Sequence, residues 1–289
     1  MDIARLQLTN VQNVAASKTV IIELPQGNAR IHQVILQHSY AAGTNTIAAA
    51  MTNISEIRVK RNGKTYWQGS GTQFRDYNLL NGTIYDCDGV PNTAPGVALA
   101  LNFAEPWRED EEDQLATAII VNGARWTIEV DLGAASTPTL TGCVMVEDFT
   151  YTGDPSKILY KKIIRDQCAA GGVKFSVPGF VLRDMLQQIS IYPDSGGSNQ
   201  PSKVTLKIAS KDRHDLTYAM NNSVNLNNKM TPTASGRTSN IYDLVLDHDG
   251  LLSRSIDLNG VVNFLLQIEA GSAMSGSTTY LVQRIGPAE

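Results

Sequence analysis

A chain of 289 residues with 42% hydrophobic and 18% charged residues can build one large or two medium-sized packed domains, and carries too little charge to be disordered. Its net charge of −4 argues against the basic surface that binds nucleic acid, so we expect no direct nucleic-acid binding. No segment approaches the length of a membrane-spanning apolar helix, and the first residues lack the pattern of a signal peptide. We therefore expect a protein that is soluble when it is made.

Alternation of apolar and polar residues runs through the chain and predicts strands. In the first half the predicted strands cover residues 19–24, 33–38, 54–60, 64–67, 97–103, 126–132 and 140–149. Asn62-Gly63 lies between two of them and is the dipeptide preferred in a two-residue hairpin turn. Short strands at this spacing, separated by Gly, Asn and Pro, predict an all-β fold of the sandwich type.

Residues 72–82 break the strand pattern and predict a short helix. Thr72 is the candidate N-cap, and Asn81-Gly82 is a good stop signal. Two polar stretches, residues 82–96 and 220–240, show no strand pattern and are predicted to be long loops. Residues 2–16 are mildly amphipathic, which suits either an arm toward a neighbour or an ordinary edge strand.

The second half of the chain repeats the first in order. Pro178 and Arg183 match Pro25 and Arg30 at an offset of 153, and residues 204–207 resemble residues 57–60 at an offset of 147. Asn259-Gly260 opens a predicted strand as Asn122-Gly123 does, at an offset of 137. The falling offsets place the extra residues of the first copy in its loops.

Three matches in the same order favour an internal duplication. The join lies in the turn-rich residues 151–156. The sequence therefore predicts two domains, residues 1–151 and 152–289, that fold as two tandem jelly-roll β-sandwiches with short helices in their loops.

The densest basic stretch of the chain follows this join and is predicted to be a solvated linker. It holds Lys157, Lys161, Lys162 and Arg165. The cysteines form no Cys-x-x-Cys pair and predict neither a disulfide framework nor a zinc site; they are Cys87, Cys143 and Cys168. Cys143 lies in an apolar strand pattern, so we expect a buried thiol. This usage is typical of a protein that folds in a reducing cytoplasm.

Motifs for catalysis are absent from the sequence. Gly63-Lys64-Thr65 lacks the leading glycine of a phosphate-binding loop, and there is no Gly-x-Ser-x-Gly nucleophile turn. The four histidines form no metal-binding pair. We expect His38 to be a satisfied core or interface group and His214 to lie in a surface loop. The chain is therefore predicted not to be an enzyme.

Acidic residues supply the remaining candidate sites. The five carboxylates of residues 109–113 repel one another and predict a solvated or cation-dependent loop. Two Asp-x-Asp-Gly turns hold Asp86 with Asp88 and Asp247 with Asp249. Both turns lack the full ligand set of a calcium loop, so they predict either plain turns or a structural Ca²⁺ site. We expect no other cofactor.

Residues 54–64, followed by residues 71–78, resemble the first jelly roll of corticovirus-type coat proteins. In that family a strand, an Asn-Gly hairpin and a short helix led by Gly-Thr or a similar cap follow one another. The rest of the chain resembles the family through its size and tandem architecture. Tectivirus coat proteins and the adenovirus hexon share the plan.

The resemblance implies a major capsid protein of a tailless, membrane-containing double-stranded DNA bacteriophage. Its homotrimers would have a pseudo-hexagonal outline and would tile an icosahedral shell over an internal membrane. The implied partners are neighbouring capsomers, penton or minor capsid proteins and the viral lipid membrane. The implied location is the virion capsid, after synthesis in soluble form in the host cytoplasm.

Two other functions stay open at this point. A carbohydrate-binding or adhesion protein with two β-sandwich modules would need exposed aromatic side chains, and the candidates Trp67, Trp107 and Trp126 are few and scattered. A glycoside-active enzyme would need a pair of carboxylates, and no pair stands out.

Overall fold

The computed structural model describes residues 3–40, 47–83, 96–121, 123–194, 199–247 and 251–287. It divides into two compact units. Unit 1 holds Met1–Lys161 with Pro287–Glu289, and unit 2 holds Lys162–Gly286. Each unit is described by itself.

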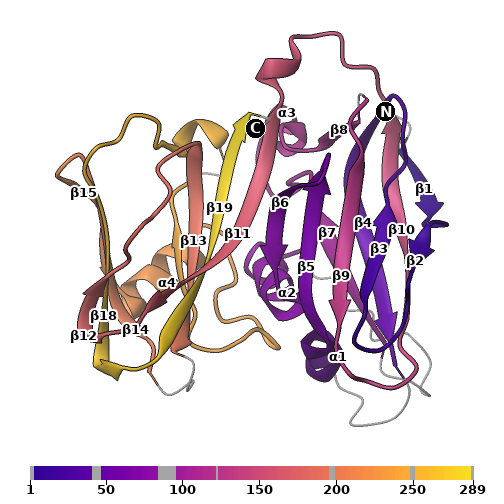
Figure 1. Cartoon of the computed structure of the whole chain (residues 1–289). Coiled ribbons are helices and arrows are strands. Elements are labelled where there is room, and N and C mark those ends of the chain that lie inside the picture. The colour runs from indigo at the N-terminus through magenta and orange to yellow at the C-terminus, as the bar shows by residue number, and fades with distance from the viewer. Residues whose placement is uncertain are drawn as a thin grey trace. The chain divides into compact units, whose positions relative to one another are not determined.

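Unit 1 is built from two antiparallel sheets (Figure 1). One sheet has the order β1-β10-β4-β7, and β8 also pairs with β4; these strands are Ile3–Gln7, Thr139–Asp148, Ala29–Ser39, Gly96–Asn102 and Ile119–Val121. The other has the order β6-β5-β9-β3-β2, formed by Lys64–Gly69, Ile54–Arg61, Trp126–Leu132, Thr19–Glu23 and Val11–Gln12. The predicted strands of the first half are thereby confirmed, with small shifts at their ends, except that β4 begins at Ala29, well before its predicted start.

Unit 2 repeats this plan. Its first sheet has the order β11-β19-β13-β16, and β17 also pairs with β13; the strands are Leu159–Ala169, Ser277–Pro287, Met185–Asp194, Tyr242–Val245 and Ile256–Asp257. Its second sheet has the order β12-β18-β14-β15, formed by Gly172–Ser176, Phe264–Met274, Pro201–Ile208 and Lys211–Thr217.

The two units pair corresponding strands in the same order. The first residues of β12 and β3 differ by an offset of 153, those of β14 and β5 by 147, and those of β17 and β8 by 137. These are the three offsets that the sequence predicts. The fold is therefore an all-β pair of tandem jelly rolls, as predicted.

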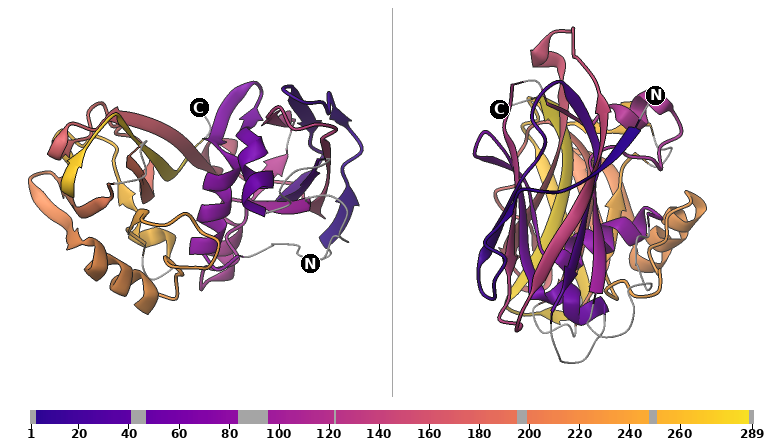
Figure 2. Two further views of the ribbon diagram at one scale, coloured as in Figure 1. Left: turned by 90° about the horizontal axis from the view of Figure 1, so that it is seen from below. Right: turned by 90° about the vertical axis from the view of Figure 1, so that its right-hand side faces the viewer.

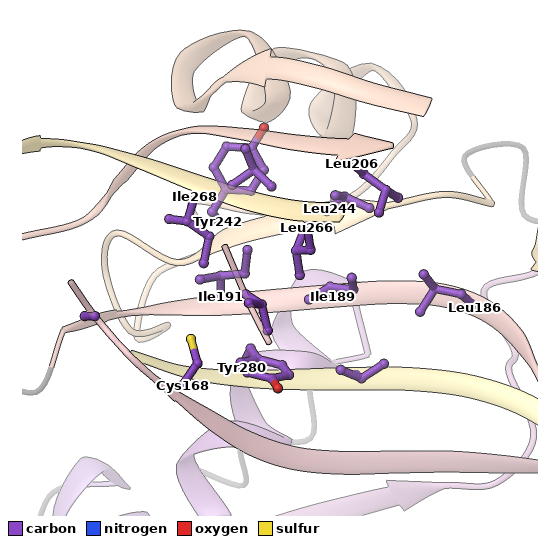
Figure 3. Packing of buried hydrophobic residues seen from close by; sticks show 14 of the residues in the cluster. Cys168, Leu186, Ile189, Ile191, Leu206, Tyr242, Leu244, Leu266, Ile268 and Tyr280 are labelled. Carbon is purple, nitrogen blue, oxygen red and sulfur yellow. The ribbon is translucent and has the colours of Figure 1, made fainter. Parts of the chain in front are cut away.

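The core of each unit lies between its two sheets. In β9, Trp126, Ile128, Val130 and Leu132 are buried and alternate with partly exposed residues, as a strand with one covered face requires. In unit 2, Figure 3 shows Ile189 and other side chains of both sheets meeting in one layer. Burial of this apolar surface drives the folding of each unit.

Short helices interrupt the strands. They are α1 (Ile47–Asn53), α2 (Gly71–Leu80), α3 (Glu111–Leu115) and α4 (Tyr218–Asn227), with 3₁₀ turns at Pro155–Lys157 and Leu252–Arg254. No helix within the described ranges is long and apolar enough to span a membrane.

The helix predicted after the first hairpin is present as α2, but its predicted cap is wrong. Ser70, and not Thr72, is the N-cap: its Oγ accepts from the Gln73 amide at 3.2 Å, while Gln73 Oε1 accepts from the Ser70 amide at 2.9 Å. This reciprocal capping box satisfies two helix-end donors at once, so it fixes the start before Thr72.

The prediction of a continuous loop over residues 220–240 is wrong as well, because α4 lies at its start. Thr217 caps α4 by accepting a hydrogen bond from the Met220 amide at 3.4 Å. The other predicted loop, residues 82–96, lies almost entirely outside the described residues. At the N-terminus, β1 is an edge strand that pairs with β10, which favours the edge-strand alternative for residues 2–16.

The hairpin turns of the two units generate a stability prediction. Asn62 and Gly63 have φ of 48° and 83°, and their counterparts Ala209 and Ser210 have φ of 51° and 63°. Left-handed backbone costs a non-glycine residue roughly 1–2 kcal/mol, so Ser210→Gly should raise the free energy of unfolding by about 1 kcal/mol. Denaturant unfolding measures this change.

The matched variant is Gly63→Ser, where an added Cβ meets nothing within 4 Å. It should destabilise the protein by a similar amount through backbone strain alone. A Ser210→Gly protein that is less stable than the wild type would show that the second turn is built differently.

Candidate functional site

A strand–hairpin–helix module occurs once in each unit and is the most closely repeated part of the chain. It comprises β5, β6 and α2 in unit 1 and β14, β15 and α4 in unit 2, and each element of the second set begins at an offset of 147 from its counterpart. The caps also correspond, because Ser70 and Thr217 are the N-caps and Asn81 and Asn228 the C-caps.

One hydrogen bond fixes each helix to the strand beneath it. Asn78 Nδ2 of α2 donates to the Ala100 carbonyl in β7 at 2.8 Å, and its counterpart Asn225 Nδ2 donates to the Asp243 carbonyl in β16 at 3.0 Å. At the helix ends, Asn81 Nδ2 and Asn228 Nδ2 each donate to the carbonyl of the fourth preceding residue at 2.9 Å. The two modules thus share side-chain roles as well as backbone shape.

The two helices bury different residue types. α2 buries Phe74, Tyr77, Leu79 and Leu80 together with the polar residues Gln73, Asp76 and Asn78. α4 instead buries Asn221, Asn222 and Asn225, while Met220 and Leu226 are 56% and 53% exposed. Both views of Figure 2 show α4 running along the outside of unit 2.

Below α4 the buried polar groups form a connected network around Asp243. Arg237 lies 2.7 Å from its carboxylate, Ser190 Oγ donates to it at 2.7 Å, and Asn221 Nδ2 donates to its backbone carbonyl at 2.8 Å. Burial raises the pKa of Asp243, and the charge of Arg237 opposes this rise. Such a network stabilises one position of the helix because a shift would leave a buried group unpaired.

Unit 1 contains a buried charge cluster that the sequence does not predict. Lys161 Nζ lies 2.8 Å from Glu105 Oε1 and donates to the Asn102 carbonyl at 2.8 Å, and Arg108 Nε pairs with the other Glu105 oxygen. The rings of Trp67, Tyr77 and Trp107 surround the Lys161 ammonium at 5.7, 5.9 and 5.2 Å. Lys161 and Glu105 are 2% and 0% exposed.

The prediction of a solvated basic linker is therefore wrong at two positions. Lys161 belongs to this cluster, and Lys162 is 7% exposed and lies 2.9 Å from Asp184. Strand β11 carries both lysines into covered positions, where each ammonium is held by a carboxylate. Burial alone would raise the pKa of Glu105, but the charges of Lys161 and Arg108 outweigh it and hold that pKa below its usual range.

The histidine predictions are half confirmed. His38 is fully buried; its Nδ1 donates to the Thr139 carbonyl at 2.9 Å and its Nε2 accepts from Asn53 Nδ2 at 2.9 Å, so it is the predicted satisfied core group. His214 is not in a surface loop but in β15, where it is 8% exposed and its Nε2 bonds to the Tyr242 hydroxyl at 2.7 Å. Its strand position faces the core.

The predicted calcium ligands are only partly described. Asp86, Asp88 and Asp249 lie outside the described residues. Asp247 is 7% exposed and accepts a hydrogen bond from Gln187 Nε2 at 3.3 Å. No group of three or more His, Cys, Asp or Glu residues in the described ranges is arranged to hold a metal ion.

The structure also shows the burial of the cysteines and of two tryptophans and the place of the acidic run. Cys168 is buried. Cys143 is only partly buried because its position in β10 faces away from the core, so the prediction of a buried thiol at Cys143 is wrong. Cys87 lies outside the described residues. Trp67 and Trp126 are each 2% exposed and cannot form a platform for sugar rings. In the acidic run, residues 111–113 begin the helix α3.

The charge cluster predicts a large effect of removing its carboxylate. Glu105→Gln leaves the two cations Lys161 and Arg108 buried without a counter-charge, so the free energy of unfolding should fall by about 3–5 kcal/mol. Glu112→Gln, at an exposed position of α3, should change it by less than about 0.5 kcal/mol. Denaturant unfolding measures both, and equal stability of the two variants would contradict the role of the cluster.

Because His38 is buried, we expect the folded protein to lose stability in mild acid. Burial lowers its pKa below the usual value, although the bond to Thr139 opposes the shift. The unfolded chain therefore binds a proton at higher pH than the folded protein does. The stabilisation is complete above about pH 6.5 and is lost as the pH falls, by at most about 1.4 kcal/mol per pH unit.

The comparison that isolates this effect is His38→Gln, measured by unfolding from pH 7.5 to pH 5. The variant should be less stable at pH 7.5 and should show a shallower loss toward pH 5. Parallel curves for the two proteins would exclude His38 as the titrating group.

The sequence and the fold of this chain were compared with those of known proteins. Residues 5–146 match the family model for the viral coat protein P2 N-terminal domain. No curated protein matches the chain in sequence.

Solved structures match over nearly the whole chain. The major capsid protein P2 of bacteriophage PM2 has 18% sequence identity to this chain and a TM-score of 0.76. The match covers 100% of this chain and 98% of the PM2 protein. The STIV major capsid protein has 12% identity and a TM-score of 0.73, and the match covers 99% of this chain and 97% of the STIV protein. PBCV-1 VP54 has 10% identity and a TM-score of 0.67, and the match covers 98% of this chain and 93% of VP54.

The fold of this chain is thus that of the double jelly-roll capsid proteins, and its buried polar clusters hold elements of that fold together. Such coat proteins are structural proteins and not enzymes. Residues 5–146 match the viral coat protein P2 N-terminal domain, and the whole chain has the fold of the double jelly-roll major capsid proteins.

Proposed function

We propose that the chain forms homotrimers that tile an icosahedral shell over an internal membrane. The observation that carries this proposal is the presence of two jelly rolls with the same strand order in one chain. Three such chains contain six equivalent jelly rolls, so a closed trimer acquires a pseudo-hexagonal outline that can pack in a lattice.

The fold is suited to repeated lateral packing. In each unit the central strands of both sheets have neighbours on both sides, so only the strands at the ends of each sheet present an edge to other chains. Copies can then associate through loops and helices. In the virion, neighbouring capsomers and penton or minor capsid proteins would contact these surfaces, and the viral lipid membrane would lie beneath the shell after synthesis in soluble form in the host cytoplasm.

We also propose that residues 1–151 and 152–289 are the two halves of an ancestral duplication. Every strand of the first half except β2 has a counterpart at the same place in the sheets of the second half, and this correspondence supports the proposal. Residues 152–157 are exposed and contain the 3₁₀ turn Pro155–Lys157, which suits a join between the halves.

The trimer has a direct test. Light scattering of the purified protein should give three times the chain mass of 31.3 kDa, and negative-stain images should show a hexagonal outline. The open alternative, a carbohydrate-binding protein, predicts a monomer that is retained on a glycan column. A stable monomer or dimer at micromolar concentration would contradict the proposed assembly.

A structural Ca²⁺ ion at the turns of Asp86 with Asp88 and Asp247 with Asp249 is also proposed. Oxygen-rich tight turns favour Ca²⁺, and binding to the folded state alone would raise the melting temperature. The melting temperature in excess Ca²⁺ should exceed that in chelator, and Asp247→Asn should reduce the difference. An unchanged melting temperature would exclude the ion.

A further inference from the structure

A cavity of about 270 Å³ lies in unit 1 against the sheet that contains β1, β4 and β10, and is covered by α3. Its apolar walls include Ile3, Pro106, Leu115 and Met145. Its polar lining includes His32, Gln33, Glu111 and Gln114. Asn102 also lines the cavity, and its carbonyl, which accepts from Lys161, connects the cavity to the Lys161 cluster.

The polar groups that line the cavity have unused hydrogen-bond acceptors. Gln33 Nε2 donates to Asn102 Oδ1 and Gln114 Nε2 donates to the Arg108 carbonyl, so the Oε1 atom of each side chain remains without a partner in the described structure. His32 also lines the cavity, and its Nε2 lies 3.1 Å from Glu147 Oε2, so the imidazole is held against a carboxylate. Gln33 and His32 are each 6% exposed.

Negative charge stands at the mouth of the cavity. Glu111 is exposed and lines it, and it has no ion-pair partner among the residues described. The neighbouring carboxylates of residues 109–113 add to the negative potential there. Apolar walls, unused acceptors and a carboxylate together favour a ligand with an apolar stem and a cationic hydrogen-bond donor. Lysine and arginine side chains have this chemistry.

We propose that the cavity binds a lysine or arginine side chain of a second copy of this chain. The choice of a second copy rests on the proposed function, because a shell is made mainly of copies of its major coat protein. The chain carries suitable groups: Lys211 and Arg213 are exposed on β15 and have no ion pair in the described parts of the structure. Glu111 at the mouth would be their counter-charge.

The chemistry of the cavity is tested with a small probe. The wild-type protein with ¹³C-methyl methionine is titrated with Nα-acetyl-lysine methylamide and followed by NMR. The Met145 methyl signal should shift and saturate, and the neutral norleucine analogue should leave it unchanged. Glu111→Gln should weaken binding about tenfold, while Glu112→Gln, which does not line the cavity, should not.

The occupant is tested by self-association. Sedimentation of wild type, Glu111→Gln and Glu112→Gln should show an assembly that is about tenfold weaker only for Glu111→Gln, with unchanged melting temperatures. If Lys211 and Arg213 are the donors, changing both of them to Glu should weaken assembly further. If that double variant assembles normally while Glu111→Gln still assembles more weakly, another basic residue of the second copy fills the cavity.

The two proposals fail in different ways. If the wild type does not associate at all, the proposed coat function is contradicted. If it associates and Glu111→Gln associates equally well, the coat function stands and the cavity inference is overturned. Binding of the lysine probe without any effect of Glu111→Gln on assembly would also overturn the second copy as occupant.

Discussion

The structure depends on how the helix after each hairpin is fixed to the sheet beneath it. In both units an asparagine at the same helical position, Asn78 or Asn225, donates to a strand carbonyl. A buried donor of this kind has one favourable position, because any rotation of the helix leaves a polar group unpaired at a cost of about 1–3 kcal/mol. The bond therefore sets the register between helix and sheet while the surrounding residues vary.

The surroundings of the two helices have diverged. In unit 1 the helix rests on aromatic residues, and a lysine from β11 lies among them, neutralised by Glu105. In unit 2 the helix rests on a polar network centred on Asp243 and leaves Met220 and Leu226 exposed. The same backbone plan thus supports two chemically different surfaces.

Sequence patterns predict most of this fold because strands with one covered face alternate visibly. β9 is predicted to the residue, and the offsets of 153, 147 and 137 identify the equivalent strands. The helix α4 escapes prediction from its own residues because its buried face is made of asparagines, which are typical of loops. The offset of 147, applied to residues 71–80, places a helix at 218–227, and the Thr217 cap agrees.

The candidate site is harder to predict, since it depends on contacts between distant segments. Lys161 looks solvated within its basic neighbourhood, and nothing local indicates that Glu105, far earlier in the chain, lies beside it. Ser70 precedes Thr72 as the cap because of the Gln73 side chain, a reciprocal signal that is readable in the sequence once the Ser-x-x-Gln spacing is considered.

The duplication is tested most directly by an experimental density map of the assembled protein at side-chain resolution. Superposing residues 54–80 on residues 201–227 should align the two hairpins and both helices, with Asn78 and Asn225 on equivalent strand carbonyls. A second helix in another register, or an Asn225 amide that faces solvent, would contradict the account.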